Sequence, residues 1–527
     1  MYGCPGCGAM MVYDIKAEDL VCTRCDRHEA ITAADERENW KSESTFSVDL
    51  LTCPQCGAEI RAMNAAAASF CSYCGAEVML DRKDDSIEPA ERIIPFRYTR
   101  EECFQKYQEM IRNNPFAEHR LKNVTADSFR GIYVPYFNYN ARVTGEANVE
   151  GHQTKGDTTY FYSTKIVLNH AYTDILHDAS VEMPDVLSEQ ISNVPTERVR
   201  PFSPAYVSGF YADRADADAD SYLNYAKAEA VRRGVTDVIH DLKDGLTYDT
   251  GKAQKELTDK TEAVYKSTLL VPTWFMSVRS GNRVLYAVMN AATGKMAADL
   301  PLDIPRFGLL ALAVFVPIFL LLNFLLTAKP GLTLSAAMLL AFFSQLVLNG
   351  RLKDILIREK GGQSSDGDLK TLLKVSNKRA KASKKKNGVV GPVIAVAACA
   401  LVLVLLKVLP GFSEMTARFS RVLAEESVAV LLCMTLTAAT WILALTGKKK
   451  KASQPFSTWV TLAVMTLSTL LLIMNPFHSA DMPVWICAIL CIASVLWTLI
   501  RMLNLHNRGC SNPMPQFGSH KGGEDRA

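Results

Sequence analysis

Apolar residues are distributed unevenly along this 527-residue chain, and their pattern divides it into three parts. Up to about residue 85, short apolar stretches alternate with cysteine, glycine and acidic residues. Between residues 86 and 305, apolar positions recur at strand and helix spacings. From Phe307 onward, long apolar blocks alternate with basic clusters. Because about 20 apolar residues in a helix cross the hydrocarbon core of a bilayer, this last part predicts membrane-spanning helices.

Six of the apolar blocks approach the length of a membrane span. They are Phe307–Thr327, Leu332–Leu348, Val389–Leu409, Val428–Leu445, Phe456–Met474 and Val484–Met502. The segment 351–387 holds twelve Lys and Arg against four acidic residues, and 448–451 is a lysine run. Since basic loops stay on the cytosolic side, we expect a multi-pass cell-membrane protein with both termini in the cytosol. The blocks contain few ionisable residues, which favours an anchor in the lipid bilayer over a transporter.

The middle part alternates strand-like and helical patterns. Thr99 and Glu102 have the spacing of a capping box, which predicts a helix over about 100–113. Gly131–Phe137 and Leu269–Met276 each surround a Val-Pro pair with aromatic and β-branched residues, which predicts two related strands. The second strand continues through the turn 280–283 into another strand, as a β-hairpin does. We therefore expect a cytosolic α+β domain. The sequence shows no nucleophile–base arrangement that would indicate an enzyme, so we do not expect catalysis.

Eight cysteines near the N-terminus form two copies of one pattern. Each copy reads CxxC, a 14-residue spacer and a second CxxC, as Cys4, Cys7, Cys22 and Cys25, and again as Cys53, Cys56, Cys71 and Cys74. A CxxC turn supplies two thiolates, and zinc in structural sites takes four of them tetrahedrally. Glycine follows three of the four pairs, where the turn needs a left-handed residue, and Asp26 follows the fourth. The pattern predicts two zinc ribbons.

We expect two Zn²⁺ ions with a structural role. Four thiolates leave no coordination position for a reactive water, and each ribbon is too small to fold without the metal. A disulfide framework or a redox-active dithiol remains an alternative. The chain opens directly into the first CxxC without a signal peptide, which favours a reducing compartment in which cysteines bind metal.

These patterns predict a multidomain protein with two small β zinc ribbons, a cytosolic α+β domain and a helical transmembrane region of about six spans. The expected segments are a first zinc ribbon at 1–30, an acidic linker at 31–50, a second ribbon at 51–85, the α+β domain at 86–305, a transmembrane hairpin at 306–350, a basic cytosolic loop at 351–387, four further transmembrane helices at 388–503 and a cytosolic tail at 504–527.

The second ribbon, the motif Ile93-Ile94-Pro95-Phe96, and the two Val-Pro strands occur in an order that resembles a family of bacterial membrane-anchored proteins with a TFIIB-type zinc ribbon. The resemblance covers roughly residues 50–327. It implies a cytosolic ribbon and an α+β domain on a membrane anchor, and it provides no established catalytic residues to carry over to this chain. It also implies a link to membrane-associated scaffolds of the SPFH class.

Charge decides between the functions that a zinc ribbon can serve. Residues 1–85 carry eight Lys and Arg against fifteen Asp and Glu, although the whole chain has a net charge of +3. Nucleic-acid binding needs clustered basic residues, so we expect no nucleic-acid partner. The leading hypothesis is an adaptor or scaffold that is tethered to the membrane and recruits a protein partner to its cytosolic face. The alternatives are a membrane-anchored nucleic-acid-binding regulator and a transporter with regulatory ribbons.

Overall fold

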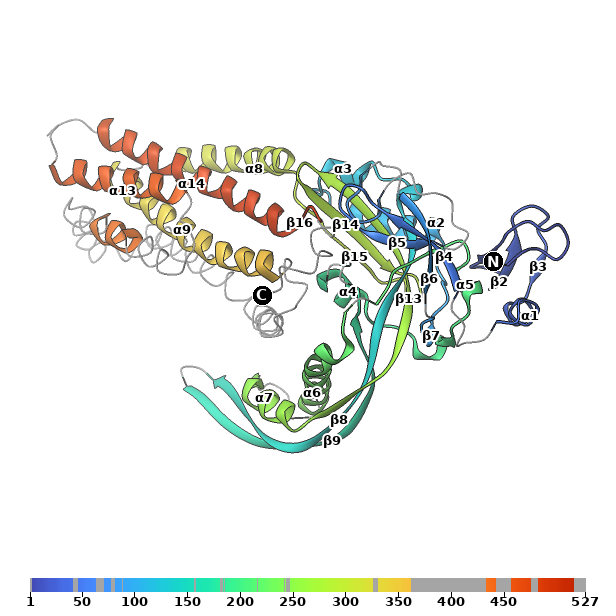
Figure 1. The fold of residues 1–527 in the computed structure, drawn as a ribbon. Helices are drawn as coiled ribbons and strands as arrows, with labels where there is room; N and C mark the ends of the chain where they lie inside the picture. Colours follow the sequence, from blue (N-terminus) through green and yellow to red (C-terminus); the bar gives the residue numbers. More distant parts are fainter. Residues whose placement is uncertain are drawn as a thin grey trace, which may run out of the picture. The chain divides into compact units, whose positions relative to one another are not determined.

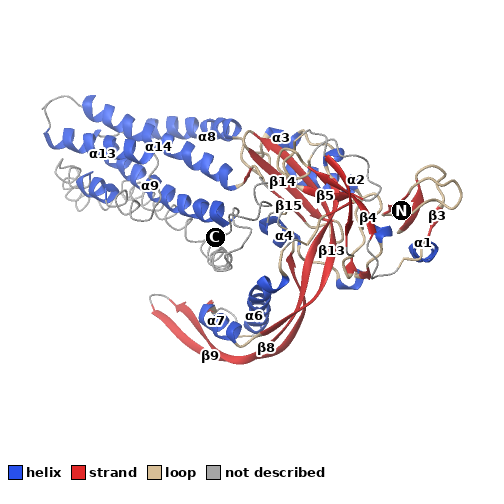
Figure 2. Cartoon of the chain, in the orientation of Figure 1, coloured by secondary structure: helices blue, strands red, loops and turns tan. Residues whose placement is uncertain are grey.

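The structure is a computed structural model that describes residues 2–40, 46–62, 71–76, 81–87, 89–155, 158–180, 183, 185–215, 217–240, 242, 247–325, 330–361, 433–441, 456–474 and 482–515. The chain divides into two compact units (Figure 1). The first comprises Met1–Leu300 together with Ser511–Ala527, and the second comprises Pro301–Cys510. Within the described residues, every strand belongs to the first unit and the second is helical (Figure 2).

The N-terminal 40 residues contain a small antiparallel sheet. Its strands are β1 (Met11–Asp14), β2 (Asp19–Cys22) and β3 (His28–Glu29), and helix α1 (Ile31–Arg37) follows. Met11 and Leu20 are fully buried, Tyr13 and Cys22 are buried as well, and the residues that alternate with them along the two strands are partly exposed. This alternation is the pattern of a strand pair with one buried face.

The rest of the first unit is built around a 13-stranded sheet. Its strands are β4 (Phe46–Thr52), β5 (Glu59–Ala62), β6 (Asp81–Ile87), β7 (Arg92–Ile93), β8 (Arg130–Lys155), β9 (Thr158–Asp178), β10 (Arg200–Pro201), β11 (Tyr211–Ala212), β12 (Thr247–Asp249), β13 (Glu262–Ser280), β14 (Arg283–Asn290), β15 (Met296–Ala298) and β16 (Asn512–Pro513). The main path runs β10-β7-β13-β8-β11-β5-β4-β6. The second ribbon, which supplies β4 and β5, is therefore part of this sheet.

Helices of the first unit cover parts of the sheet. They are α2 (Arg100–Arg112), α3 (His119–Lys122), α4 (Asp185–Ile191), α5 (Pro204–Val207), α6 (Leu223–His240) and α7 (Gly251–Asp259), with 3-10 turns η1 (Ala126–Ser128), η2 (Thr196–Arg198) and η3 (Ala219–Tyr222). The predicted capping box is confirmed at the start of α2. The Thr99 side chain accepts from the Glu102 backbone N–H, and the Glu102 carboxylate accepts from the Thr99 N–H.

The two Val-Pro segments are confirmed as strands and pair with each other in antiparallel register. Val134 of β8 lies opposite Val271 of β13, and the predicted hairpin then leads from β13 into β14. Side chains along these central strands alternate between two cores, as strand geometry requires. Tyr133 and Trp274 face the core that holds the first ribbon and α2, whereas Ile132 and Phe275 face the core that holds the second ribbon and α4. The two ribbons thus pack into cores on opposite faces.

Strands β8 and β9 continue beyond this core as a long curved hairpin with α6 and α7 on its inner side (Figure 1). Val143, Val149, Ile166 and Leu168 of the hairpin are buried against these helices. The outward side chains at alternating positions, such as Val167, are exposed.

The described residues of the second unit form four long helices and one short helical segment. The helices are α8 (Ile304–Leu325), α9 (Pro330–Gly361), α13 (Phe456–Met474) and α14 (Met482–Gly509), and the segment is 433–441. Apolar residues of α9, α13, α14 and 433–441 form one core. Inside it, the Gln345 amide donates to Thr461 at 2.9 Å and to Thr498 at 3.0 Å, and its oxygen accepts from Thr458 at 3.0 Å.

The expectation of about six membrane spans is wrong for the described residues, in which one helix, Met482–Gly509, is long and apolar enough to cross a membrane. Shorter apolar helices cover Ile304–Val314, Thr333–Asn349 and Phe456–Leu471. The expected span Val389–Leu409 lies outside the described residues, as does Val428–Leu445 apart from 433–441. The six-span fold class and the multi-pass localisation therefore lose their support.

The physical reason is that an apolar run predicts burial without saying what buries it. A core helix of a soluble protein and a signal sequence can be as long and apolar as a membrane span, so length and composition alone do not establish a crossing. The hydroxyl and amide groups around Gln345 show that these helices also bury polar partners against one another. The cytosolic placement of the termini, which depended on six spans, loses its basis as well.

Candidate metal centres and an adjoining cavity

The first predicted metal site is brought together at one end of the small N-terminal sheet. The sulfur atoms of Cys4, Cys7, Cys22 and Cys25 all lie within 4.8 Å of one another. Cys4 and Cys22 are buried, and Cys7 and Cys25 are exposed. The tight turn Cys4–Cys7 precedes β1, and Cys22 ends β2, so the small sheet sets the distance between the two pairs.

The second predicted site is assembled in the same way but lies inside the protein. Cys53, Cys56, Cys71 and Cys74 have their sulfur atoms within 4.8 Å of one another, and all four residues are buried. Cys53 follows β4 directly, and β5 begins three residues after Cys56. The structure therefore groups all eight predicted cysteines into the two sets that the spacing indicated.

All four CxxC turns share one backbone geometry. In each, the N–H of the first cysteine donates to the carbonyl five residues later, and the N–H four residues later donates back to the first cysteine's carbonyl, at 2.8–3.2 Å. The residue after the second cysteine adopts a positive φ, at 70° for Gly8, 75° for Gly57, 65° for Gly75 and 53° for Asp26. The interpretation of Asp26 as a left-handed residue in place of glycine is confirmed.

The sulfur positions fit a tetrahedral zinc ion. Zinc–sulfur bonds of about 2.3 Å place the sulfurs of a regular tetrahedron about 3.8 Å apart. The closest pairs measure 3.5 Å for Cys7–Cys22, 3.6 Å for Cys4–Cys25, 3.7 Å for Cys56–Cys71 and 3.9 Å for Cys53–Cys74. Disulfide bonds are about 2.0 Å long, so these distances fit metal ligands and not disulfides. Each set could bind one metal ion, and the donor atoms are those of zinc sites.

Backbone N–H groups prepare the sulfurs for negative charge. The Arg24 N–H donates to Cys22 Sγ at 3.4 Å and lowers the pKa of Cys22 to about 6. The Gly6 N–H does the same for Cys4, whose pKa is also lowered. In the second set, the pKa of Cys74 is lowered, mainly by its hydrogen bond with Cys56. The pKa of Cys56 is raised, mainly by its hydrogen bond with Cys71. Four adjacent thiols cannot all ionise unless a cation compensates their charge.

Both ribbons are tied to the rest of the first unit by hydrogen bonds. In the first, the Tyr13 N–H donates to the Ser208 carbonyl at 3.0 Å, and Ser208 Oγ donates to the Met11 carbonyl at 2.7 Å. In the second, Tyr286 of β14 donates its hydroxyl to the Tyr73 carbonyl at 2.8 Å. Tyr73 lies between Cys71 and Cys74, so this bond fixes the turn that holds two of the ligands.

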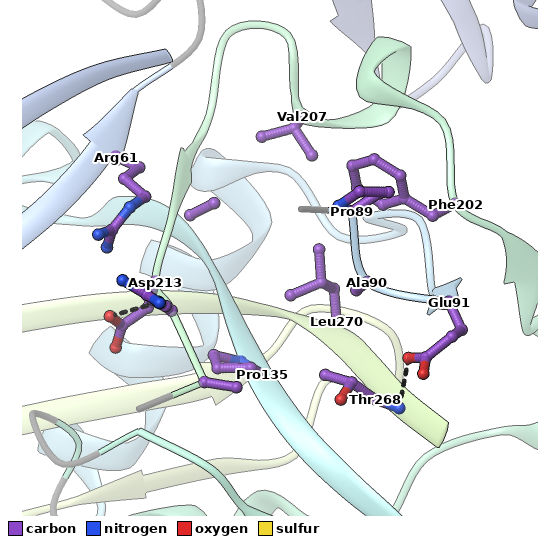
Figure 3. Close-up of a pocket in the computed structure, with 13 residues that line it drawn as sticks. Arg61, Pro89, Ala90, Glu91, Pro135, Phe202, Val207, Asp213, Thr268 and Leu270 are labelled. Atoms are coloured by element: carbon purple, nitrogen blue, oxygen red, sulfur yellow. Dashed lines mark hydrogen bonds between the residues drawn. The ribbon is translucent and has the colours of Figure 1, made fainter. Parts of the chain in front are cut away.

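A buried carboxylate connects the second metal site to a cavity. Tyr73 donates its hydroxyl to Asp213 at 3.0 Å, Ser180 donates to the same carboxylate, and the Arg214 N–H donates to it at 2.8 Å. Asp213 is one of the residues that line a cavity of about 470 Å³ (Figure 3). This volume is within the range of small-molecule and side-chain binding sites.

The cavity is lined by both apolar and charged residues (Figure 3). Pro135 and Leu270 belong to its apolar lining, here called the apolar floor, and Arg61 and Glu91 lie on different sides. Arg61 comes from β5 of the second ribbon and is 4% exposed, and Phe202 comes from the core that holds the first ribbon. The Glu91 carboxylate accepts from the Thr268 N–H at 2.7 Å, which fixes its position. The cavity therefore borders residues that pack with both ribbons.

Sequence reasoning missed these cavity residues. Tyr73 was marked only by its place inside a CxxC turn, and no spacing connects it to Asp213, which is 140 residues away. Arg61 reads in the sequence as an ordinary residue of a short strand.

Comparison with known proteins yields one relative. The chain is 26% identical over 321 residues to the uncharacterized protein YdjG of Bacillus subtilis, an alignment that covers 57% of this chain and 90% of that protein. No family model matches the sequence, and no solved structure matches it. The resemblance to a YdjG-like protein thus has support, whereas membership of the TFIIB-type zinc-ribbon family is not established.

Proposed function

We propose that this chain is an adaptor whose two zinc ribbons, of the TFIIB-type ribbon class, hold a surface that binds a protein partner. The observation that carries the proposal is the pair of four-cysteine clusters in one sheet unit, each a complete ligand set with at least two of its cysteines in a core of that unit. A zinc ion with four thiolate ligands has no open position for a substrate or a reactive water. Metal bound in this way supplies folding energy and rigidity to the surface around it.

The cavity beside Arg61 and Glu91 is where we propose that the partner inserts a side chain. Its apolar floor would bury the body of the side chain, and its charged walls would orient a polar end. Tyr73, which lies between Cys71 and Cys74, donates a hydrogen bond to Asp213 of the cavity. Zinc bound by these cysteines would therefore also keep the cavity wall in place. The zinc and the cavity then serve one binding surface.

Charge argues against nucleic acid as the partner. The first 85 residues carry fifteen acidic and eight basic side chains. Each site of four thiolates and one Zn²⁺ adds two formal negative charges. Phosphate backbones bind through clustered Lys and Arg, which these ribbons lack.

The adaptor proposal is tested with the full-length chain carrying Cys53→Ser and Cys56→Ser together. Metal analysis of the purified wild type should give two zinc ions per chain, and the double variant should retain one. After crosslinking in the producing cells, wild type should recover at least one protein that the double variant loses. Cys510→Ser is the matched control, because Cys510 lies outside both clusters. An identical set of recovered proteins from all three chains would refute the role of the second ribbon in binding.

The nucleic-acid alternative is tested by titrating the full-length chain with duplex DNA. We expect no binding at physiological salt. Non-specific DNA-binding proteins show dissociation constants of about 10⁻⁴–10⁻⁶ M under these conditions, and their affinity falls steeply as salt increases. Micromolar, salt-sensitive binding would replace the adaptor with a nucleic-acid-binding protein.

A further inference from the structure

Strand β9 has one paired edge and one edge without a strand partner among the described residues. It pairs with β8 from Thr158, opposite Lys155, to Asp178, opposite Tyr136, and with no other described strand. β8, by contrast, is paired on both edges, with β13 and β12 along one edge and with β9 and β11 along the other. Helices α6 and α7 pack against the inner face of the hairpin and not along the edge of β9 (Figure 1). The outer backbone groups of β9 are therefore placed to accept another strand.

The outer edge of β9 lacks the features that usually prevent an edge strand from pairing with a strand of another molecule. Proteins protect such edges with proline, bulges, short strands or charged side chains. The pairing of β8 and β9 is regular from Thr158 to Tyr172, and irregularity begins only near Asp174, where φ is 56°. The stretch contains no proline and one lysine. That residue, Lys165, is ion-paired with Glu146 of β8, so its charge is compensated within the hairpin.

We infer that β9 pairs antiparallel with β9 of a second copy of this chain, which joins two sheets across a two-fold axis. A strand edge is complementary to another strand edge, because each supplies the N–H and carbonyl groups that the other lacks. A second copy presents an edge of identical length, and a two-fold axis brings the same patch of both copies together. This inference concerns a surface separate from the metal sites and does not depend on the adaptor function.

The side chains define a register in which the two edges are compatible. With Val167 on the two-fold axis, Val167 faces its own copy, and Lys165 faces Asn169. On the opposite face of the strand, Tyr162 lies across from Tyr172, and Ile166 lies across from Leu168. No like charges are opposed in this register, and cross-strand aromatic and β-branched pairs stabilise a sheet. Val167, which is 59% exposed in the single chain, becomes covered by its symmetry mate.

The test measures the oligomeric state of the full-length chain by analytical ultracentrifugation over a range of concentrations. Wild type should be a dimer that dissociates on dilution. Val167→Lys places two ammonium groups opposite each other on the axis and should weaken the dimer by about tenfold or more. Val264→Lys is the matched control, because Val264 is 66% exposed on β13 next to the hairpin but is away from the β9 edge. This control should remain as dimeric as wild type.

A mixing experiment tests the register itself. Val167→Glu alone should weaken the dimer to a similar extent, whereas an equimolar mixture of Val167→Lys and Val167→Glu chains should form a tighter heterodimer, since opposite charges then meet at the axis. Amide hydrogen exchange along 163–171 should slow as the wild-type concentration rises, because the outer N–H groups become bonded. A monomeric wild type would overturn the inference. So would a Val167→Lys dimer that dissociates at the same concentration as wild type, or a complex at this edge with a different protein.

Discussion

His177 shows how a single residue can make the stability of this fold depend on pH. Its imidazole is 7% exposed, stacks on Tyr222 with ring centroids 3.9 Å apart, and contacts Tyr225 edge-on at 4.5 Å. Its Nδ1 donates to the Asp178 carbonyl at 2.8 Å, a bond that the neutral ring makes. Burial lowers the pKa of His177 to about 4. The folded chain therefore keeps this histidine neutral at pH values where the unfolded chain protonates it.

The consequence is a loss of stability in acid. The unfolded pKa of histidine is about 6.5, so above that pH the residue contributes no penalty. As the pH falls from about 6.5 to about 4, the unfolded state binds a proton at His177 that the folded state does not bind. The free energy of unfolding therefore decreases by about 3 kcal/mol. Replacing His177 with Phe keeps an aromatic ring and removes the titration. The measurement is the difference in urea midpoint between the two chains at pH 7 and at pH 4, which cancels effects of acid on the metal sites. An equal acid response in both chains would contradict the assignment.

At the scale of elements, β8 is held closely against a pair of stacked aromatic rings. Phe96 and Phe210 stack with their ring centroids 4.3 Å apart and 13° between the ring planes. Gly131 of β8 lies directly beneath them, and a Cβ atom there would be 2.6 Å from Phe210 Cδ1 and 3.2 Å from Phe96 Cζ. The absence of a side chain at this position lets the strand approach the rings.

Gly131→Ala should therefore destabilise the first unit. The added methyl group forces the aromatic rings or the strand to move, which costs about 1–3 kcal/mol in well-packed cores. Gly3→Ala is the control, because a Cβ atom on Gly3 meets nothing within 4 Å. Thermal unfolding followed by near-ultraviolet circular dichroism should show a lower midpoint for Gly131→Ala and an unchanged one for Gly3→Ala. Equal midpoints would show that the rings shift without cost.

Local features of this fold were predictable from sequence, and distant contacts were not. The four CxxC turns, the left-handed Asp26 and the capping box at Thr99 each depend on residues within a few positions of one another. The bond between Tyr73 and Asp213 and the pairing of β8 with β13 join residues more than one hundred positions apart. The apolar helices misled the prediction because membrane spans and core helices of soluble proteins share the same length and apolar composition.

At the scale of the whole molecule, the two metal clusters differ in their access to solvent. Cys7 and Cys25 of the first cluster are exposed, whereas all four cysteines of the second are buried within a core of the sheet unit. A chelator or thiol reagent must reach the sulfur atoms before it can remove the metal. The folded sheet thus shields one site and leaves the other open.

Zinc release should accordingly occur in two phases. When the wild-type chain is mixed with a thiol-modifying reagent and a colorimetric zinc indicator, we expect about one equivalent of zinc to appear rapidly and one slowly. Cys4→Ser with Cys7→Ser should remove the fast phase, and Cys53→Ser with Cys56→Ser should remove the slow phase. A single phase that releases both ions together would mean that the two ribbons open as one cooperative structure.

The short strand β16 has a consequence for how the chain can be made. Asn512 pairs with Val284 of β14, its side chain donates to Asp299 at 2.8 Å, and Arg283 donates to Ser511 Oγ at 2.7 Å. All of Pro301–Cys510 lies between these partners in the sequence. A ribosome therefore delivers the strand that completes the edge of β14 only after it has synthesised the entire helical unit. Until then, a nascent chain that has already folded both ribbons still presents an unfinished sheet to the cell.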